Sequence, residues 1–130
     1  SPTKKNLVPN ARAVLDYLIR KYRLLIVTNG FEDIHATKLA SSGIDNYFDG
    51  VVTSEMAGHK KPARGIFDFA LAMGNYRAHE VIMVGDNLNT DIKGAHNASI
   101  DSVYFNPRKK AHGAEVKHEI SDLIELKSIL

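Results

Sequence analysis

The chain has 130 residues, of which 44% are hydrophobic and 25% charged, a composition that suits one compact domain with a modest core. Its 17 basic and 15 acidic residues give a net charge of +2, which is too balanced to favour a nucleic-acid-binding surface. The absence of cysteine excludes disulfides, thiolate zinc sites and a cysteine nucleophile, and it fits a reducing, cytoplasmic compartment.

The N-terminal stretch SPTKKNLVPN contains no apolar segment of the kind found in signal peptides. No apolar run elsewhere approaches the roughly 18 residues that span a bilayer, so we expect neither export nor membrane insertion. The basic triplet Arg108 to Lys110 is interpreted as a solvated loop.

Helix-like and strand-like segments alternate along the chain. A helical period starts at Ala11 and runs to about Lys21, with Asn10 as its expected N-cap. The apolar run LLIV, residues 24–27, is typical of a strand buried on both faces of a parallel sheet. The later pattern predicts strands around 51–52, over 81–84 and over 102–105. It predicts helices over about 31–42, 63–74, 92–98 and 121–130. Gly43 is expected to end the first of these helices and Ser121 to cap the last.

This alternation predicts an α/β fold, a Rossmann-like, doubly wound parallel sheet, in a single domain over residues 1–130. Ligands of such folds bind beyond the carboxyl ends of the strands. Thr28, the segment Lys60-Lys61-Pro62 and Asp86 each follow a predicted strand. We therefore expect these residues, which are far apart in the sequence, to meet at one edge of the sheet.

Two of these positions suit an anionic phosphate. The hydroxyl of Thr28 and the backbone N–H groups of Asn29, Gly30 and Phe31 lie at a predicted helix N-terminus, where free donors and the helix dipole attract anions. Thr28 and Asn29 are equally typical of simple helix caps. Lys61 offers a positive charge for a phosphoryl group, although a surface lysine beside a helix start is an equally good interpretation.

Two carboxylates follow the strand predicted over 81–84. Asp86 is a hard oxygen ligand of the kind Mg²⁺ takes, and Mg²⁺ needs few protein ligands because it keeps several waters and binds phosphate oxygens. Asp91, one turn into the next helix, would orient those waters or hold Lys61, unless it serves only to complement the helix dipole.

The order of these motifs carries a family resemblance. The segments LLIVTNG, KKPARGIFDFAL and VIMVGDNLNTDIKGA resemble motifs two, three and four of the haloacid dehalogenase (HAD) superfamily of phosphohydrolases, in the family's order and at similar spacings. The resemblance covers about Pro9 to Pro107. The GDNLNTD form and the lead-in before Tyr17 are similar to members with a helical cap, including nucleotidases that act on small phosphate esters.

The resemblance implies a role for each residue of the predicted site. Thr28, with Asn29 and Gly30, would bind the phosphoryl group of a small phosphorylated metabolite. Lys61, which directly precedes the proline, would stabilise the nucleophile and the phosphate. Asp86 would ligate Mg²⁺, and Asp91 would support the metal waters or Lys61.

The first motif of the family, an apolar strand that ends in Asp-x-Asp and supplies the nucleophile, does not occur in this sequence. The resemblance therefore implies a partial core domain whose central strand and cap lie upstream, and a chain that is inactive without them. Buried backbone groups left unpaired cost roughly 1–3 kcal/mol each. We expect the isolated chain to be marginally stable, or to pair its open sheet edges with the missing segment or with a second copy.

Two other functions remain open from the sequence. A non-catalytic module would keep the phosphate or Mg²⁺ pocket and serve binding or assembly. A phosphoacceptor receiver domain also combines acidic residues with Lys-Pro, but there Lys-Pro follows the acidic residues, whereas Lys61-Pro62 precedes Asp86 here. The histidines show no metal-ligand spacing and are expected to be solvent-facing or capping, with His59 the nearest in sequence to Lys61; they are His35, His59, His79, His96, His112 and His118.

Overall fold

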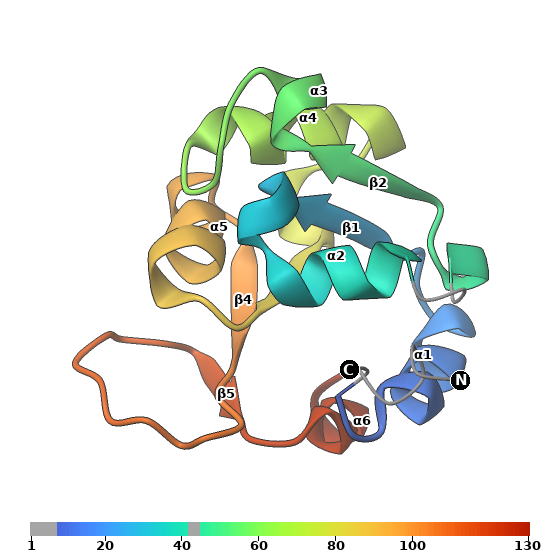
Figure 1. Ribbon diagram of the computed structural model, residues 1–130, viewed down its shortest axis with the longest axis vertical. Coiled ribbons are helices and arrows are strands. Elements are labelled where there is room, and N and C mark those ends of the chain that lie inside the picture. The colour runs from blue at the N-terminus through green and yellow to red at the C-terminus, as the bar shows by residue number, and fades with distance from the viewer. Residues whose placement is uncertain (1–7, 42–44) are drawn as a thin grey trace.

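The computed structural model describes residues 8–41 and 45–130 (Figure 1). All paired strands run parallel, and helices alternate with strands over most of the chain, so the predicted α/β class with parallel sheets is confirmed. The strands are β1 (Leu25–Thr28), β2 (Gly50–Thr53), β3 (Ile82–Gly85), β4 (Asp101–Phe105) and β5 (His118–Ile120). The helices are α1 (Ala11–Ile19), α2 (Ile34–Ser41), α3 (Ser54–Ala57), α4 (Arg64–Gly74), α5 (Lys93–Asn97) and α6 (Leu126–Ile129).

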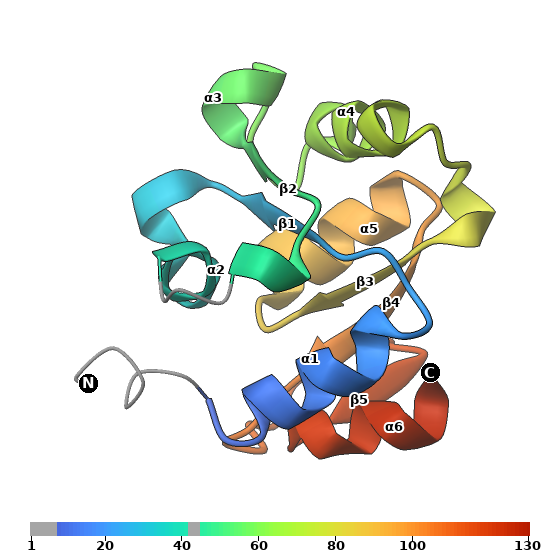
Figure 2. The same ribbon diagram turned by 90° about the vertical axis from the view of Figure 1, so that its right-hand side faces the viewer.

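The strands form two parallel sheets, β1–β2 and β3–β4–β5. Each sheet has an open edge strand, β1 in one and β3 in the other, and these two strands lie side by side in the middle layer of the molecule (Figure 2). Residues of both strands line a cavity of about 1400 Å³. The strand that the family resemblance places between them stays a prediction.

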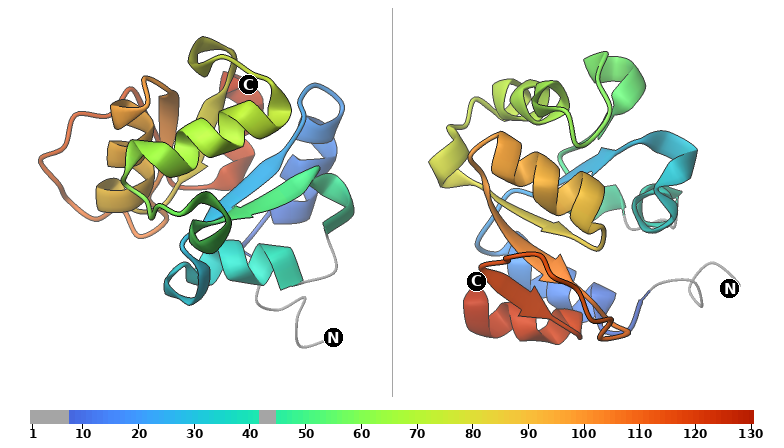
Figure 3. Two further views of the ribbon diagram at one scale, coloured as in Figure 1. Left: turned by 90° about the horizontal axis from the view of Figure 1, so that it is seen from above. Right: turned by 90° about the vertical axis from the view of Figure 1, so that its left-hand side faces the viewer.

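Helices cover both faces of the sheets, and each face has its own apolar core (Figure 3). On one face, α4 packs against β2 and α5 packs against α4 and β4, with Val52 and Ile66 fully buried. On the other face, Val14 of α1 and Leu126 of α6 pack against Val103 of β4. Burial of these side chains on two faces gives the doubly wound arrangement that the alternating sequence predicted.

Of the two predicted helix caps, one is at the predicted residue and one is not. Asn10 is the N-cap residue of α1, but its backbone is left-handed (φ 67°) and its side-chain amide donates to the carboxylate of Asp122 at 3.0 Å instead of capping the helix. Asp122, not Ser121, caps the last helical segment by accepting the backbone N–H of Ile124. The two side chains satisfy each other across 112 residues of sequence, a contact that no local pattern reveals.

The segment after β1 also differs from the prediction. Residues Gly30–Glu32 form a 3-10 turn, and the helix expected from Phe31 begins at Ile34. Its predicted end, Gly43, lies outside the described residues. The strand β5 was not predicted, because His118 and Glu119 give its three residues no apolar run.

The surface features follow the sequence. The basic residues Arg108, Lys109 and Lys110 are exposed in the loop after β4, as predicted. Within residues 8–41 and 45–130, no helix combines the length and the hydropathy needed to cross a membrane.

Candidate active site

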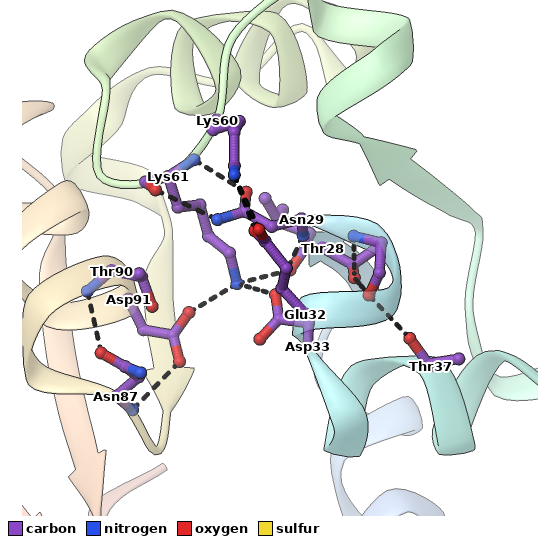
Figure 4. Close-up of polar contacts among 12 residues, drawn as sticks. Thr28, Asn29, Glu32, Asp33, Thr37, Lys60, Lys61, Asn87, Thr90 and Asp91 are labelled. Atoms are coloured by element: carbon purple, nitrogen blue, oxygen red, sulfur yellow. Dashed lines mark hydrogen bonds and ion pairs between the residues drawn. The ribbon is translucent and has the colours of Figure 1, made fainter.

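The carboxyl ends of β1 and β3 bring the predicted residues together (Figure 4). Thr28 ends β1, and Asp86 follows the last residue of β3. Lys61 comes from the connection between α3 and α4 and points between the two strand ends towards Asp91 (Figure 4). Lys61, Asp86 and Asp91 all line the cavity between the sheets.

Lys61 is the buried centre of the site, with only 2% of its side chain exposed. Its ammonium donates to the carbonyl of Val27 at 3.0 Å and contacts Asp91 Oδ1 and Asp33 Oδ2, each at 2.6 Å. A buried ammonium must be paired to offset the loss of its hydration. Two carboxylates therefore compensate one cation here.

Asp91 is held from both sides. Its Oδ1 accepts from Lys61, while its Oδ2 accepts the backbone N–H groups of Asp86 and Asn87 at 3.1 and 3.2 Å. The turn that carries it is a short π-helix, Leu88–Ile92, which Asn87 caps. Burial raises the pKa of the Asp91 carboxyl, and the neighbouring ammonium of Lys61 opposes this shift. The sequence suggested that Asp91 orients metal-bound waters or holds Lys61. The contact with the Lys61 ammonium fits the second role.

Asp33 is a member of the site that the sequence did not single out. It follows the 3-10 turn after β1, and its Oδ2 accepts the backbone N–H of Asn29 at 3.0 Å and forms an ion pair with the ammonium of Lys61. Its position in the acidic segment FEDIH gave no signal, because nothing local distinguishes it from Glu32, which pairs at the surface with Lys60.

The residues expected to bind phosphate use their polar groups within the protein. The N–H of Gly30 donates to the Thr28 hydroxyl at 3.0 Å, and the N–H of Asn29 donates to Asp33, so neither is free as the sequence suggested. The Asn29 side chain instead binds Lys61, accepting its backbone N–H at 2.8 Å and donating to its carbonyl at 3.1 Å. An anion at this turn must therefore displace existing partners.

Asp86 is more accessible than Asp33 and Asp91, with 32% of its side chain exposed. Its Oδ2 lies 3.3 Å from Nε2 of His35 on α2, a contact that sequence reasoning missed because it joins a helix and a strand end that are 51 residues apart in the sequence. His59, by contrast, packs against Gly65 at the start of α4.

The donors around Asp86 suit Mg²⁺, which keeps several water ligands, better than a metal whose ligands all come from the protein. In the part of the chain that the structure describes, no group of three or more His, Cys, Asp or Glu side chains is arranged to hold a metal. A cation bound at Asp86 must therefore keep waters or take oxygens from a ligand, which is the usual behaviour of Mg²⁺.

Comparisons with known proteins identify the family of this chain. Residues 3–105 match the family of haloacid dehalogenase-like hydrolases. The chain is 35% identical over 126 residues to the pyrimidine 5'-nucleotidase YjjG of Escherichia coli, an alignment covering 95% of this chain and 56% of that protein. It is 42% identical over 99 residues to a glyceraldehyde 3-phosphate phosphatase of Pyrococcus abyssi, covering 75% and 42%.

The fold is similar to the magnesium-bound crystal structure of the putative HAD-hydrolase YfnB from Bacillus subtilis, with a TM-score of 0.83, 30% identity, and coverage of 94% of this chain and 55% of that one. The chain thus spans about half the length of the relatives that it matches. Since the family match covers residues 3–105, most of the sequence, the chain belongs to the haloacid dehalogenase-like hydrolase family.

Proposed function

We propose that this chain is the C-terminal part of the core domain of a Mg²⁺-dependent phosphohydrolase that acts on a small phosphorylated metabolite. The observation that carries the proposal is the burial of Lys61 between Asp33 and Asp91 at the carboxyl ends of β1 and β3. A cation fixed in this way is suited to stabilise charge on a transferring phosphoryl group. The named relatives include a pyrimidine 5'-nucleotidase and a glyceraldehyde 3-phosphate phosphatase.

In this proposal the residues of the chain bind and orient the phosphoryl group. The ammonium of Lys61 neutralises negative charge on the phosphate and on the attacking group. The Thr28 hydroxyl, at the end of β1, would exchange its contacts with Gly30 for a phosphate oxygen. Asp91 keeps Lys61 in place through Oδ1 while its Oδ2 stays bound to the β3–α5 connection.

Asp86 is the residue that would hold Mg²⁺. Bound there, the ion would supply positive charge against the phosphate oxygens. Asp86 lines the cavity and is only partly buried, which leaves room for waters to complete the coordination shell.

The nucleophile belongs to a segment outside this sequence. No Asp-x-Asp follows an apolar strand here, and β1 and β3 present open edges to a shared cavity. We propose that an apolar strand enters between them, pairs with both edges and carries its terminal aspartate to Lys61, and that the 130 residues alone are inactive.

The test uses the natural gene product, whose intact mass we expect to exceed 14.4 kDa. Its turnover of nucleoside monophosphates and sugar phosphates is measured with and without Mg²⁺ for wild type, Asp86→Asn, Lys61→Ala and the control Lys60→Ala. We expect Asp86→Asn to abolish the Mg²⁺ dependence and Lys61→Ala to lower kcat by about 10²–10³. Wild-type turnover in Lys61→Ala contradicts the proposal, and tight binding without turnover in the wild type favours the non-catalytic module.

A further inference from the structure

The Lys61 ammonium is already surrounded by partners. It donates hydrogen bonds to the carbonyl of Val27 and to Asp91 Oδ1, and it forms an ion pair with Asp33 Oδ2 at 2.6 Å. With 2% of the side chain exposed, water has almost no access to it. A phosphoryl group can therefore bind Lys61 only if one partner leaves.

The three partners differ in how firmly they are held. The carbonyl of Val27 is part of β1. The Asp91 side chain is 4% exposed, and its second oxygen accepts two backbone N–H groups. Asp33 is 16% exposed, and both polar contacts of its carboxylate use the same oxygen, Oδ2. Asp33 is thus the partner that can leave at the lowest cost.

The charges at the site favour the same exchange. Asp33, Asp86 and Asp91 bring three carboxylates to the lining of the cavity, against the single ammonium of Lys61. A phosphate dianion adds to this negative charge and is repelled most by a carboxylate that stays on the same ammonium.

We infer that Asp33 is a positioning residue that pairs with the Lys61 ammonium until a phosphoryl group replaces it. Through the N–H of Asn29, the same carboxylate also holds the turn after β1 against Lys61, so its release frees one backbone donor for the incoming anion. This inference rests on the proposed function, because it requires a phosphate site at Lys61.

The test is the affinity of the natural gene product for inorganic phosphate, measured by calorimetry at saturating Mg²⁺. Asp33→Asn removes the competing charge but keeps an acceptor for the N–H of Asn29. We expect its Kd for phosphate to fall at least about fivefold, because the repulsion between two like charges about 4 Å apart gives this factor even in bulk water. The KM of a phosphate ester should fall with it, whereas a purely structural residue would raise KM and lower kcat. Asp33→Ser, which also lacks the charge and retains a side-chain oxygen that can accept a hydrogen bond, serves if Asp33→Asn does not fold.

Two control variants complete the design. Asp33→Glu keeps the charge and should bind phosphate within twofold of wild type. Asp68→Asn removes an exposed carboxylate that pairs with Arg64, and it should also leave the Kd unchanged. If the wild type binds phosphate and both uncharged variants, Asp33→Asn and Asp33→Ser, bind it with an equal or higher Kd, only the role of Asp33 is overturned. No phosphate binding by any protein, wild type included, overturns the phosphate site itself and the proposed function with it.

Discussion

The side-chain amide of Asn29 makes two hydrogen bonds to the backbone of Lys61, a pair of contacts that we call the clamp. Its Oδ1 accepts the N–H of Lys61 at 2.8 Å, and its Nδ2 donates to the carbonyl of Lys61 at 3.1 Å. The connection before α4 is thereby fixed to the end of β1, across 32 residues of sequence. The clamp sets where the Lys61 ammonium lies relative to Thr28.

Removing this clamp should displace Lys61. Asn29→Ala loses two hydrogen bonds, each worth about 1 kcal/mol, so we expect about 2 kcal/mol of destabilisation in urea unfolding. In the natural gene product, kcat should fall by about 10- to 100-fold, because a small misplacement of a charged group is costly to catalysis. The matched control is Asn97→Ala, which removes one exposed hydrogen bond to the carbonyl of the adjacent Pro62. Equal effects of the two substitutions would contradict the role of the clamp.

The adjacent lysines should differ sharply in their contribution to stability. Lys61→Ala leaves the carboxylates of Asp33 and Asp91 without their cation in a buried site, which typically costs about 3–5 kcal/mol. Lys60→Ala breaks an exposed ion pair with Glu32, for which we expect less than about 1 kcal/mol. Urea denaturation of the two variants of the 130-residue chain checks this difference. A loss of similar size in both would show that the buried pairing contributes little.

Gly85, the last residue of β3, should be intolerant of any side chain. A Cβ at this position would overlap the side chain of Asp91, the residue that holds Lys61. We therefore expect Gly85→Ala to cost about 1–3 kcal/mol and to lower turnover in the natural gene product, because relief of the overlap moves Asp91. Gly113→Ala adds the same methyl group where no atom lies within 4 Å, and should stay within about 0.5 kcal/mol of wild type. Unimpaired turnover in Gly85→Ala would contradict this prediction.

The loop after β4 should make stability depend on pH. The side-chain amide of Asn106 and the ring of His112 bind the carboxylate of Glu119, and these hydrogen bonds lower the pKa of Glu119 from its ordinary 4.5. In the unfolded chain the carboxyl takes up its proton at the higher pH. The contribution of Glu119 is therefore fully present above 4.5 and is lost as the pH falls through the lowered folded pKa.

Asn106→Ala removes the largest cause of this shift and should flatten the dependence. The free energy of unfolding, measured by urea denaturation at several pH values from 4.5 downwards, should fall less steeply in the variant than in the wild type. The two curves should approach each other at the acidic end. Parallel curves would mean that Asn106 does not set the pKa of Glu119.

The open edges of β1 and β3 should make the 130-residue chain associate. Unpaired backbone groups at sheet edges pair readily with other strands, and here both edges line one cavity. Size-exclusion chromatography with light scattering should detect species of twice 14.4 kDa that dissociate on dilution. A monomer with cooperative unfolding at high concentration would show that the chain closes its edges by itself.

The sequence by itself determined the strands that lead to the site and the residues at their ends. The runs LLIV and VIMV are apolar without alternation, which is typical of parallel strands, and parallel strands end at the same side of a sheet. The meeting of Lys61 with Asp91 followed from this rule and from the family resemblance.

Only the tertiary structure decided how the charges at the site are paired. Asp33 reaches Lys61 because the chain makes a 3-10 turn at Gly30–Glu32, which no hydrophobic period marks, and His35 reaches Asp86 because α2 lies beside the end of β3. Periodicity reports which side chains are buried, a property of neighbouring residues. Ion pairs between residues tens of positions apart depend on where separate loops converge, and that is settled only when the sheets and helices pack together.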